Sequence, residues 1–383
     1  MGGLNETPAG NRIRIAFFGR RNAGKSTLVN AFTGQQIAIV SDVAGTTTDP
    51  VSKAMEILPL GPCLITDTAG LDDEGELGAM RVAKSLSVLA TADIAVWVDD
   101  ARGVEDDSIE KNFENECRRR KVTVFRYRRS DDVEDLKRRI AAVRLETPAA
   151  LLEGLAAAGD HVVLVCPIDE SAPKGRIILP QQQVIRECLD LHAVCSVCQP
   201  PELASVLAAA PGNSLVVTDS QAFGEVRRIM VESGSKAALT SFSILFARQK
   251  GELKAFLEGI EAIRNLRDGD KVLIAEGCTH HRQCNDIGAV KIPKAVERLS
   301  GCRPDFSFVS GGGFLPEDGE RYKLVVHCGG CMLNRREVLR RIAEARAHGA
   351  AIVNYGILLA AANGMEGIAE NGLVSVQGVQ GAD

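Results

Sequence analysis

The sequence has few aromatic residues, no excess of basic charge and no long apolar run. Aromatic residues make up 4% of its 383 residues, which leaves few stacking surfaces for single-stranded nucleic acid. The formal net charge of −5 also argues against a general nucleic-acid-binding protein. No segment approaches the length of a membrane-spanning helix, and the first residues contain no apolar signal core. We therefore expect a cytoplasmic protein that binds neither membrane nor nucleic acid.

The composition is sufficient for several packed domains. Hydrophobic residues make up 45% and charged residues 25%, and the length suits two or three domains. Short apolar segments alternate with helical ones throughout, which is typical of α/β domains with parallel sheets. We expect three such domains, over residues 1–148, 149–250 and 251–383, with a helix just after the first boundary.

A phosphate-binding motif follows the first apolar segment. Residues 19–26, Gly-Arg-Arg-Asn-Ala-Gly-Lys-Ser, have the required spacing and precede a helical segment. In such a loop the backbone N–H groups wrap the phosphates, Lys25 reaches the β and γ phosphates, and the Ser26 hydroxyl binds Mg²⁺. A chance glycine-rich turn is the alternative, and the strand and helix around the motif argue against it. The expected phosphate-binding residues are Gly19, Asn22, Ala23, Gly24, Lys25, Ser26 and Thr27.

Two further segments follow in the order of a P-loop GTPase. Asp67-Thr68-Ala69-Gly70 comes after an apolar segment, and it supplies a carboxylate that holds Mg²⁺ through water and a Gly70 N–H near the γ phosphate. Residues 45–49, Gly-Thr-Thr-Thr-Asp, lie between the two motifs, where a threonine of a switch loop can close on Mg²⁺. We therefore expect a P-loop GTPase domain followed by two smaller α/β domains.

These segments resemble the GTPases typified by Era and the tRNA-modifying GTPase MnmE. Leu71 follows the second motif where Ras-like proteins carry a catalytic glutamine. The resemblance implies that Thr47 binds Mg²⁺ and that K⁺ contacts Asn22, Thr46 and the backbone of Ser41 and Val43. It also implies that four residues take part in catalysis: Lys25, Thr47, Asp67 and Gly70. Three further residues would contact the nucleotide: Thr46, Thr68 and Ala69.

The motif that reads guanine is missing. These GTPases carry Asn-Lys-X-Asp after the next strand, whereas this chain has Val-Thr-Val-Phe-Arg-Tyr-Arg-Arg-Ser-Asp-Asp over residues 122–132. Asp131 or Asp132 could replace the missing carboxylate. The alternative, which we favour, is that both are solvated acids that open a helix. GTP is the expected substrate, and the missing motif predicts weak discrimination between GTP and ATP.

Cysteine and histidine residues gather in the last third of the chain. Cys278-Thr279-His280 ends one apolar segment and His327-Cys328-Gly-Gly-Cys331 ends another, with 46 residues between His280 and His327. Two such strand ends can meet at the carboxyl edge of a sheet. Three thiolates with one exchangeable ligand suit an iron–sulfur cluster, but cysteine with histidine also suits tetrahedral zinc. The spacing alone does not separate these alternatives, and unligated cysteines are a third.

A second Cys-X-X-Cys, formed by Cys195 and Cys198, lies in a segment that reads as a strand. Residues three apart in a strand point to opposite faces. We therefore expect two buried small side chains rather than a chelating pair.

The combination of these motifs resembles the FeFe-hydrogenase maturation GTPases, the HydF family. The stretches 167–190 and 239–253 resemble the dimerisation domain of that family, and 275–295 and 322–342 resemble its cluster-binding domain. The resemblance implies a homo-oligomer, dimer or tetramer, that holds a 4Fe-4S cluster. It further implies transfer of a di-iron unit, made with the radical-SAM maturases HydE and HydG, to the hydrogenase apo-enzyme, with GTP hydrolysis gating partner exchange. The implied cluster ligands are Cys278, Cys328 and Cys331, with His280 and His327 near the fourth iron.

Two other functions are alternatives for a chain with these motifs. An RNA-directed GTPase of tRNA modification or ribosome assembly would carry a nucleic-acid clamp or a Cys-X-Gly-Lys motif, and we identify neither. A simple electron-transfer iron–sulfur protein would have no use for the nucleotide-binding head.

Overall fold

The computed structural model describes most of the chain, in two compact units, Met1–Thr147 and Pro148–Asp383. The described residues are 9–35, 50–73, 75–100, 107–145, 149–168, 177–277, 287–310, 314–315, 320–330, 333–364 and 372–374.

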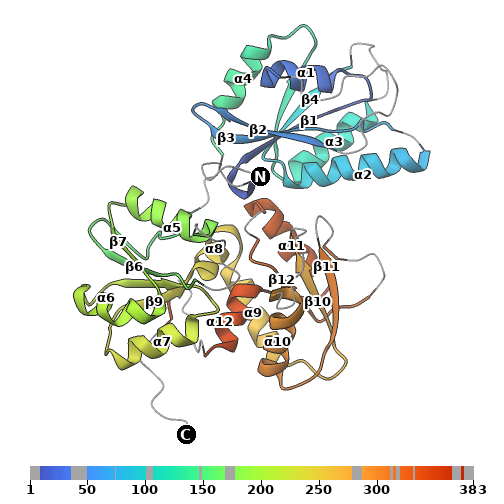
Figure 1. Ribbon diagram of the computed structural model, residues 1–383. Coiled ribbons are helices and arrows are strands. Elements are labelled where there is room, and N and C mark those ends of the chain that lie inside the picture. The colour runs from blue at the N-terminus through green and yellow to red at the C-terminus, as the bar shows by residue number, and fades with distance from the viewer. Residues whose placement is uncertain are drawn as a thin grey trace. The chain divides into compact units, whose positions relative to one another are not determined.

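The first unit contains a five-stranded sheet in the order β2-β3-β1-β4-β5 (Figure 1). All neighbouring strands are parallel except β2 and β3. Adjacent residues of β1 point to opposite faces, so that Phe17 packs with α1 and α4 and Phe18 packs with α2 and α3. The elements are η1 (Ala9–Asn11), β1 (Ile13–Gly19), α1 (Lys25–Thr33), β2 (Val51–Ile57), β3 (Gly61–Asp67), α2 (Gly75–Thr91), β4 (Ile94–Val98), α3 (Ser108–Arg119), β5 (Thr123–Tyr127) and α4 (Val133–Ala141).

The second unit contains two four-stranded parallel sheets, in the orders β7-β6-β8-β9 and β11-β10-β12-β13. The first is built from β6 (His161–Val165), α5 (Leu179–Asp190), β7 (Val194–Cys198), η2 (Pro200–Glu202), α6 (Leu203–Ala209), β8 (Leu215–Thr218), α7 (Phe223–Glu232), β9 (Ala238–Ser241) and α8 (Phe242–Lys250). The second is built from α9 (Leu253–Arg264), β10 (Lys271–Glu276), η3 (Ile287–Lys291), α10 (Ile292–Ser300), β11 (Asp305–Ser310), β12 (Leu324–His327), α11 (Arg335–Ala347), β13 (Ala351–Asn354) and α12 (Tyr355–Ala362).

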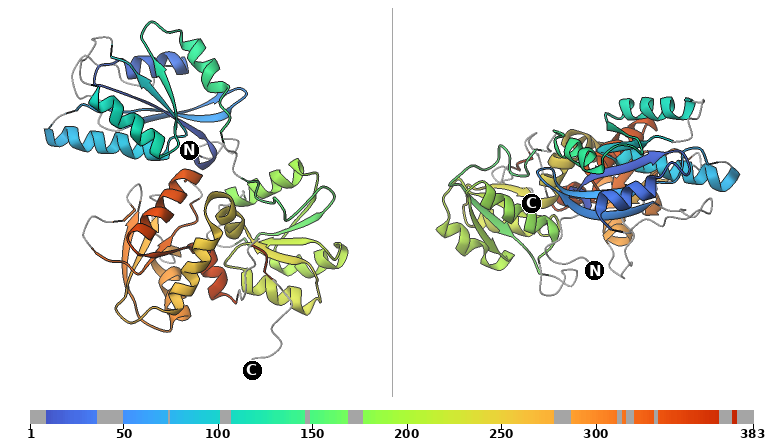
Figure 2. Two further views of the ribbon diagram at one scale, coloured as in Figure 1. Left: turned by 180° about the vertical axis from the view of Figure 1, so that it is seen from behind. Right: turned by 90° about the horizontal axis from the view of Figure 1, so that it is seen from above.

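One continuous apolar core joins the two sheets of the second unit. Side chains of β8, α8, α9, β12 and α12 belong to the same buried cluster, and α8, α9 and α12 lie between the sheets in both views (Figures 1 and 2). A segment near the end of the chain returns to the first sheet, where Val374 pairs with Leu239 of β9. The Thr240 hydroxyl also donates to the Gly372 carbonyl at 2.9 Å. These contacts make the second unit a single packed body.

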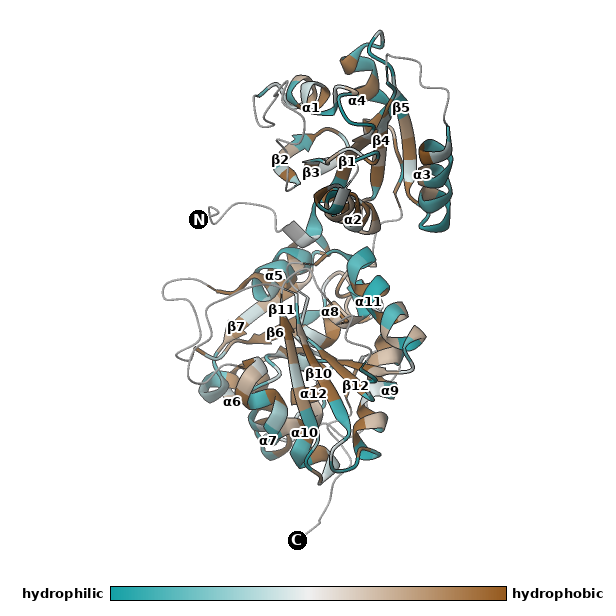
Figure 3. Cartoon of the chain, turned by 90° about the vertical axis from the view of Figure 1, so that its right-hand side faces the viewer, coloured by the Kyte–Doolittle hydropathy of each residue, from teal (hydrophilic) through white to brown (hydrophobic). Residues whose placement is uncertain are grey.

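The distribution of hydropathy matches this layering. Apolar residues concentrate on the strands, and the outer faces of helices such as α11 are hydrophilic (Figure 3). Among the helices that the structure describes, none combines the length and the apolar character needed to cross a bilayer.

The expected alternation of apolar strands with helices is confirmed, and the apolar segments before the phosphate-binding motif and the two cysteine segments are β1, β10 and β12. The helix expected just after residue 148 is wrong, because residues 151–155 form turns. The amide groups of Leu151 and Leu152 donate to the two carboxylate oxygens of Glu187, at 2.8 and 2.5 Å. Since this carboxylate caps both amides, the segment is held as turns against α5 and does not extend into a helix.

Candidate functional sites

The phosphate-binding loop joins the end of β1 to the start of α1. At Gly19 a side chain is excluded, because a Cβ atom there would lie 2.6 Å from the Val98 carbonyl oxygen. The chain then takes left-handed conformations at Asn22 (φ 61°) and at Gly24 (φ 97°), which caps α1. The loop therefore ends at the N-terminus of a helix, where backbone N–H groups and the helix dipole favour a phosphate.

Lys25 is folded over this loop. Its side chain is buried, and Nζ donates to the carbonyl oxygens of Gly19 (3.3 Å) and Arg20 (2.7 Å). Burial lowers the pKa of the ammonium group, and the nearby carboxylate of Asp67 opposes that shift. A cation held inside the loop can exchange its carbonyl partners for phosphate oxygens when a nucleotide binds.

Ser26 and Asp67 form the polar pair that suits Mg²⁺. The Ser26 hydroxyl donates to Oδ2 of Asp67 at 2.6 Å. The other carboxylate oxygen, Oδ1, is buried and has no hydrogen bond of normal geometry. Burial raises the pKa of Asp67, and the Ser26 hydrogen bond and Lys25 oppose this rise. Because a buried carboxylate oxygen is costly when unsatisfied, a hydrated divalent cation beside the Ser26 hydroxyl fits this donor set.

The segment after β3 lies against the phosphate-binding loop. The Thr68 hydroxyl donates to the Phe17 carbonyl at 2.7 Å, and the Ala69 carbonyl accepts from Ser85 at 3.2 Å. A Cβ atom on Gly70 would lie 2.7 Å from the Arg21 nitrogen. Two residues further, the Asp72 carboxylate accepts from that Arg21 N–H at 2.5 Å. The glycine allows this close approach, so the two motifs share one edge of the sheet as the sequence predicts.

The remaining predicted nucleotide residues are only partly described. Asn22 and Thr27 are exposed and Ala23 is half-buried in the loop. Thr46 and Thr47 lie outside the described residues, as do Ser41 and Val43. The structure therefore brings together Gly19, Lys25, Ser26, Asp67 and Gly70, and the predicted K⁺ and threonine contacts remain predictions.

The two acids proposed as substitutes for the guanine-reading residue have local roles. Asp132 caps α4 by accepting from the Glu134 N–H at 3.1 Å. Asp131 closes the turn before it by accepting from the Arg128 N–H at 2.7 Å. Both are exposed. The favoured alternative, solvated acids that open a helix, agrees with this geometry.

The second candidate site lies at the carboxyl ends of β10 and β12. These strands are parallel neighbours, with Ala275 opposite His327, and the Cys328 N–H donates to the Ala275 carbonyl at 2.9 Å. The Gly277 N–H, one residue before Cys278, donates to Sγ of Cys328 at 3.0 Å. Hydrogen bonds to the sulfurs are among the factors that set the potential of an iron–sulfur cluster, so this bond fits a cysteine that holds one. Cys278, His280 and Cys331 lie outside the described residues.

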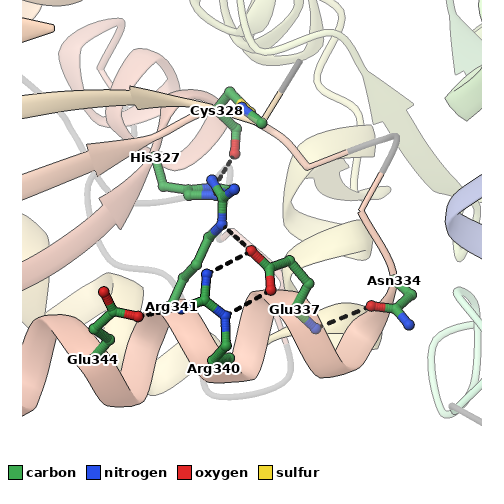
Figure 4. A network of polar contacts seen from close by, with 8 residues as sticks. His327, Cys328, Asn334, Glu337, Arg340, Arg341 and Glu344 are labelled. Carbon is green, nitrogen blue, oxygen red and sulfur yellow. Dashed lines mark hydrogen bonds and ion pairs between the residues drawn. The ribbon is translucent and has the colours of Figure 1, made fainter. Parts of the chain in front are cut away.

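His327 lies beneath this edge and is buried (Figure 4). Its Nδ1 is 2.5 Å from the Cys328 carbonyl oxygen and its Nε2 is 3.1 Å from Nη1 of Arg341. A guanidinium group can only donate, so Nε2 accepts and the neutral ring donates from Nδ1. Burial, aided by the Arg341 charge, lowers the pKa of His327 to about 4. In this arrangement both ring nitrogens have partners, and none of the sequence motifs indicates the role of Arg341.

Arg341 is in turn held by Glu337, whose Oε1 accepts from Nε at 2.6 Å (Figure 4). The guanidinium also lies 5.1 Å from the Phe314 ring centroid. The N–H of Glu337 donates to the Asn334 side chain at 3.0 Å, which caps α11. The start of α11 thus orients Arg341, Arg341 orients His327, and His327 holds the Cys328 carbonyl.

The cysteines of the other Cys-X-X-Cys, Cys195 and Cys198, lie on opposite faces of their sheet. Cys195 packs into the core on one face of its sheet and Cys198 into the core on the other, so the prediction of opposite faces is confirmed. Both are half-buried rather than fully buried. Across the described part of the chain, no three cysteine, histidine or acidic residues are grouped as metal ligands.

Comparison with protein families divides the chain into three matches. Residues 14–127 match the 50S ribosome-binding GTPase family. Residues 151–251 match the hydrogen maturase F dimerization domain, and residues 254–370 match the hydrogen maturase F tetramerization domain. The chain belongs to the hydrogen maturase F family. This maturase therefore combines a GTPase domain with two domains for homo-oligomerisation, and the resemblance seen in the sequence is confirmed.

The head of the maturase is also similar to curated GTPases over a short stretch. It is 40% identical over 96 residues to the tRNA modification GTPase MnmE of Endomicrobium trichonymphae, covering 24% of this chain and 21% of that protein. It is 38% identical over 100 residues to the GTPase Der of Campylobacter hominis, covering 26% and 22%. The maturase thus spans about a fifth of the length of these relatives.

A search of solved structures matches Era from Aquifex aeolicus bound to GDP and AlF4−. The match has 15% identity, a TM-score of 0.27 and coverage of 79% of this chain and 94% of that one. Similarity at this level adds nothing to the assignment.

Proposed function

We propose that this maturase is a GTPase that carries an iron–sulfur cluster and delivers a di-iron precursor to the apo-enzyme of FeFe-hydrogenase. Its head hydrolyses GTP to GDP and phosphate, and hydrolysis gates the exchange of partners. The radical-SAM maturases HydE and HydG are the proposed sources of the precursor. The observation that carries this proposal is the Gly277 N–H bond to the Cys328 sulfur, at the edge where the two cysteine segments begin.

In the head, each described residue has a role set by its position. Lys25 donates to loop carbonyls in this structure. When a nucleotide binds, its ammonium group would contact the β and γ phosphates instead. Ser26 and Asp67 would hold Mg²⁺, directly and through water. The Gly70 N–H would lie near the γ phosphate, beside the loop it contacts. Thr47 would complete the Mg²⁺ shell and Thr46 with Asn22 would hold K⁺. Catalysis would then consist of positioning and charge stabilisation, as phosphoryl transfer requires.

At the cluster edge, Cys278, Cys328 and Cys331 would hold a 4Fe-4S cluster. When bound, the cluster would supply an iron with an exchangeable ligand to which the di-iron unit can attach. His280 is the proposed neighbour of that iron. His327 fits a supporting role better, because its Nδ1 holds the Cys328 carbonyl and its Nε2 is held by Arg341. It would fix the backbone of Cys328 so that the sulfur faces the Gly277 N–H.

The test is anaerobic reconstitution followed by iron and sulfide analysis and electron paramagnetic resonance. Cys278→Ser, Cys328→Ser and Cys331→Ser should each lose the cluster and stop hydrogenase activation. GTP hydrolysis should persist, because the head is a separate compact unit. Cys195→Ser is the matched control and should keep its iron. Stoichiometric zinc without iron and sulfide, or loss of the cluster in Cys195→Ser, would contradict the proposal.

The oligomeric state is tested separately. We propose that residues 149–250 form a homodimer, which the match to a dimerization domain supports. Closed two-fold assembly is the commonest outcome for such a domain. Light scattering at micromolar concentration should give at least a dimer, and a tetramer would indicate that the domain over residues 254–370 also associates.

A further inference from the structure

A buried lysine from α8 reaches the loop between Cys328 and α11. Lys250 is 5% exposed. Its Nζ donates to the carbonyl oxygens of Leu333 (3.1 Å) and Gly330 (3.4 Å), and it lies 5.4 Å from the Phe246 ring centroid. The two carbonyls come from residues on either side of Cys331 in the sequence. The ammonium group therefore holds the loop at two points that flank a proposed cluster ligand.

The lysine and the loop belong to different domains of the maturase. Lys250 lies within the stretch matched to the dimerization domain, residues 151–251, and the loop lies within the stretch matched to the tetramerization domain, residues 254–370. The contact is thus made from the domain that carries no cluster ligand to the domain that carries all of them.

We propose that Lys250 is a positioning residue for the Cys328–Cys331 loop and that its charge favours the reduced form of the cluster held there. This inference rests on the proposed function, since it requires a cluster on the loop. Two hydrogen bonds from one buried donor restrict the loop before any iron arrives. The loop is held from its other end by the His327 bond to the Cys328 carbonyl.

The electrostatic part requires Lys250 to be charged, and its two carbonyl acceptors favour the ammonium form. A positive charge in a low-dielectric interior acts strongly on neighbouring charges. Reduction adds one negative charge to a cluster that already bears thiolates, so a fixed cation beside the loop stabilises the reduced state. Net charge and hydrogen bonding around the sulfurs are known determinants of the potential of such clusters.

The experiment compares Lys250→Met, which removes donor and charge, with Lys250→Gln, which keeps a donor and removes the charge. Lys254→Met is the matched control, because Lys254 is an exposed lysine at the start of α9. Each full-length protein is reconstituted anaerobically, its iron is counted, and its midpoint potential is measured by a redox titration followed by electron paramagnetic resonance. Hydrogen exchange of residues 328–333 is measured on the iron-free proteins.

Lys250→Gln should keep most of its iron and show a more negative midpoint potential than the parent. Lys250→Met should lose iron and exchange the loop amides faster even without iron. Lys254→Met should match the parent in all three measurements. If Lys250→Met does not fold, Lys250→Gln still tests the charge.

An unchanged potential in Lys250→Gln would overturn the electrostatic part. Unchanged exchange and iron content in Lys250→Met would overturn the positioning part. If the parent protein itself binds no cluster, the proposed function fails instead, and the hydrogen-exchange result on iron-free protein still decides whether Lys250 restrains the loop.

Discussion

Arg341 donates from Nη1 to Nε2 of His327 across 3.1 Å, and both side chains are buried. The arginine also forms an ion pair with Glu337 at 2.6 Å. One buried ion pair is therefore used to fix the tautomer of a histidine, and through it the backbone of Cys328.

Arg341→Met should lower the free energy of unfolding of the second unit by about 3 kcal/mol, because it leaves the buried Glu337 carboxylate without its inner partner. Chemical denaturation monitored by circular dichroism would measure this. Arg335→Met on the same helix is the control, since Arg335 is exposed and should change stability by less than about 0.5 kcal/mol. Equal effects of the two substitutions would argue against a structural role for the Arg341 pair.

Glu337→Gln should alter how stability depends on pH. Burial tends to raise the pKa of Glu337, but the hydrogen bonds and charges of Arg340 and Arg341 outweigh it and lower that pKa in the folded state. The ionised carboxylate therefore contributes stability above its unfolded pKa, and this is lost as the pH falls through the folded pKa. The stability difference between the parent and Glu337→Gln should be largest near pH 7 and shrink below about pH 4.5. A difference that stays constant down to pH 3 would contradict this assignment.

Asp132→Ala should cost about 1 kcal/mol of stability through loss of the α4 cap. It should leave the ratio of GTP to ATP affinity unchanged, because the carboxylate already accepts from the Glu134 N–H. Calorimetric titration with both nucleotides measures the ratio. A fall in GTP affinity with ATP affinity preserved would show that Asp132 reads the base.

Lys25→Ala should abolish triphosphate binding or turnover, because it removes the charge that the loop holds for the β and γ phosphates. Lys111→Ala, an exposed lysine on α3, serves as the control for loss of a lysine elsewhere in the head. Phosphate release assays report turnover, and measurable GTP hydrolysis at the parent rate in Lys25→Ala would exclude this loop as the site.

GTP hydrolysis should have a low rate, and this rate should be higher in K⁺ than in Na⁺. The resemblance to the Era and MnmE GTPases implies a K⁺ contact for Asn22, and Leu71 follows the second motif in place of a catalytic glutamine. Turnover is compared in the two salts at equal ionic strength, with Asn22→Ala as the variant that should remove the difference. Equal rates for the parent in both salts would count against a K⁺ site.

The parts of the fold that could be predicted from the sequence are those with local causes. Apolar segments of strand length, each followed by a motif with glycine or cysteine, predicted β1, β10 and β12, and hence the two sheet edges where the candidate sites lie. The failure at residues 151–155 has a distant cause, since Glu187 is far along the chain and its carboxylate takes up the amides of Leu151 and Leu152. The hydrophobic periodicity of residues 149–160 carries no information about a carboxylate that binds their amides from another helix.

The buried cations were missed for a different reason. Arg341 shares a helical face with Val338, Ile342 and Ala345, which are buried, and Lys250 shares one with Phe246 and Ala247. A charged residue in an apolar helical stripe is the signal that could have found both. Whether such a residue extends to water or bonds inside the protein depends on its tertiary neighbours, and these are set by the packing of α8 and α11 around the cysteine loop.

The pairing of Val374 with Leu239 has a consequence for dissecting this protein. The strand β9 is the last in its sheet, and an open strand edge is a template for unwanted association with other chains. A fragment that stops near residue 251 would lose the covering segment and also expose the apolar side of α8. The dimerization and tetramerization stretches should therefore be cloned together, because a cut between them passes through one cooperative body and would yield an aggregating product.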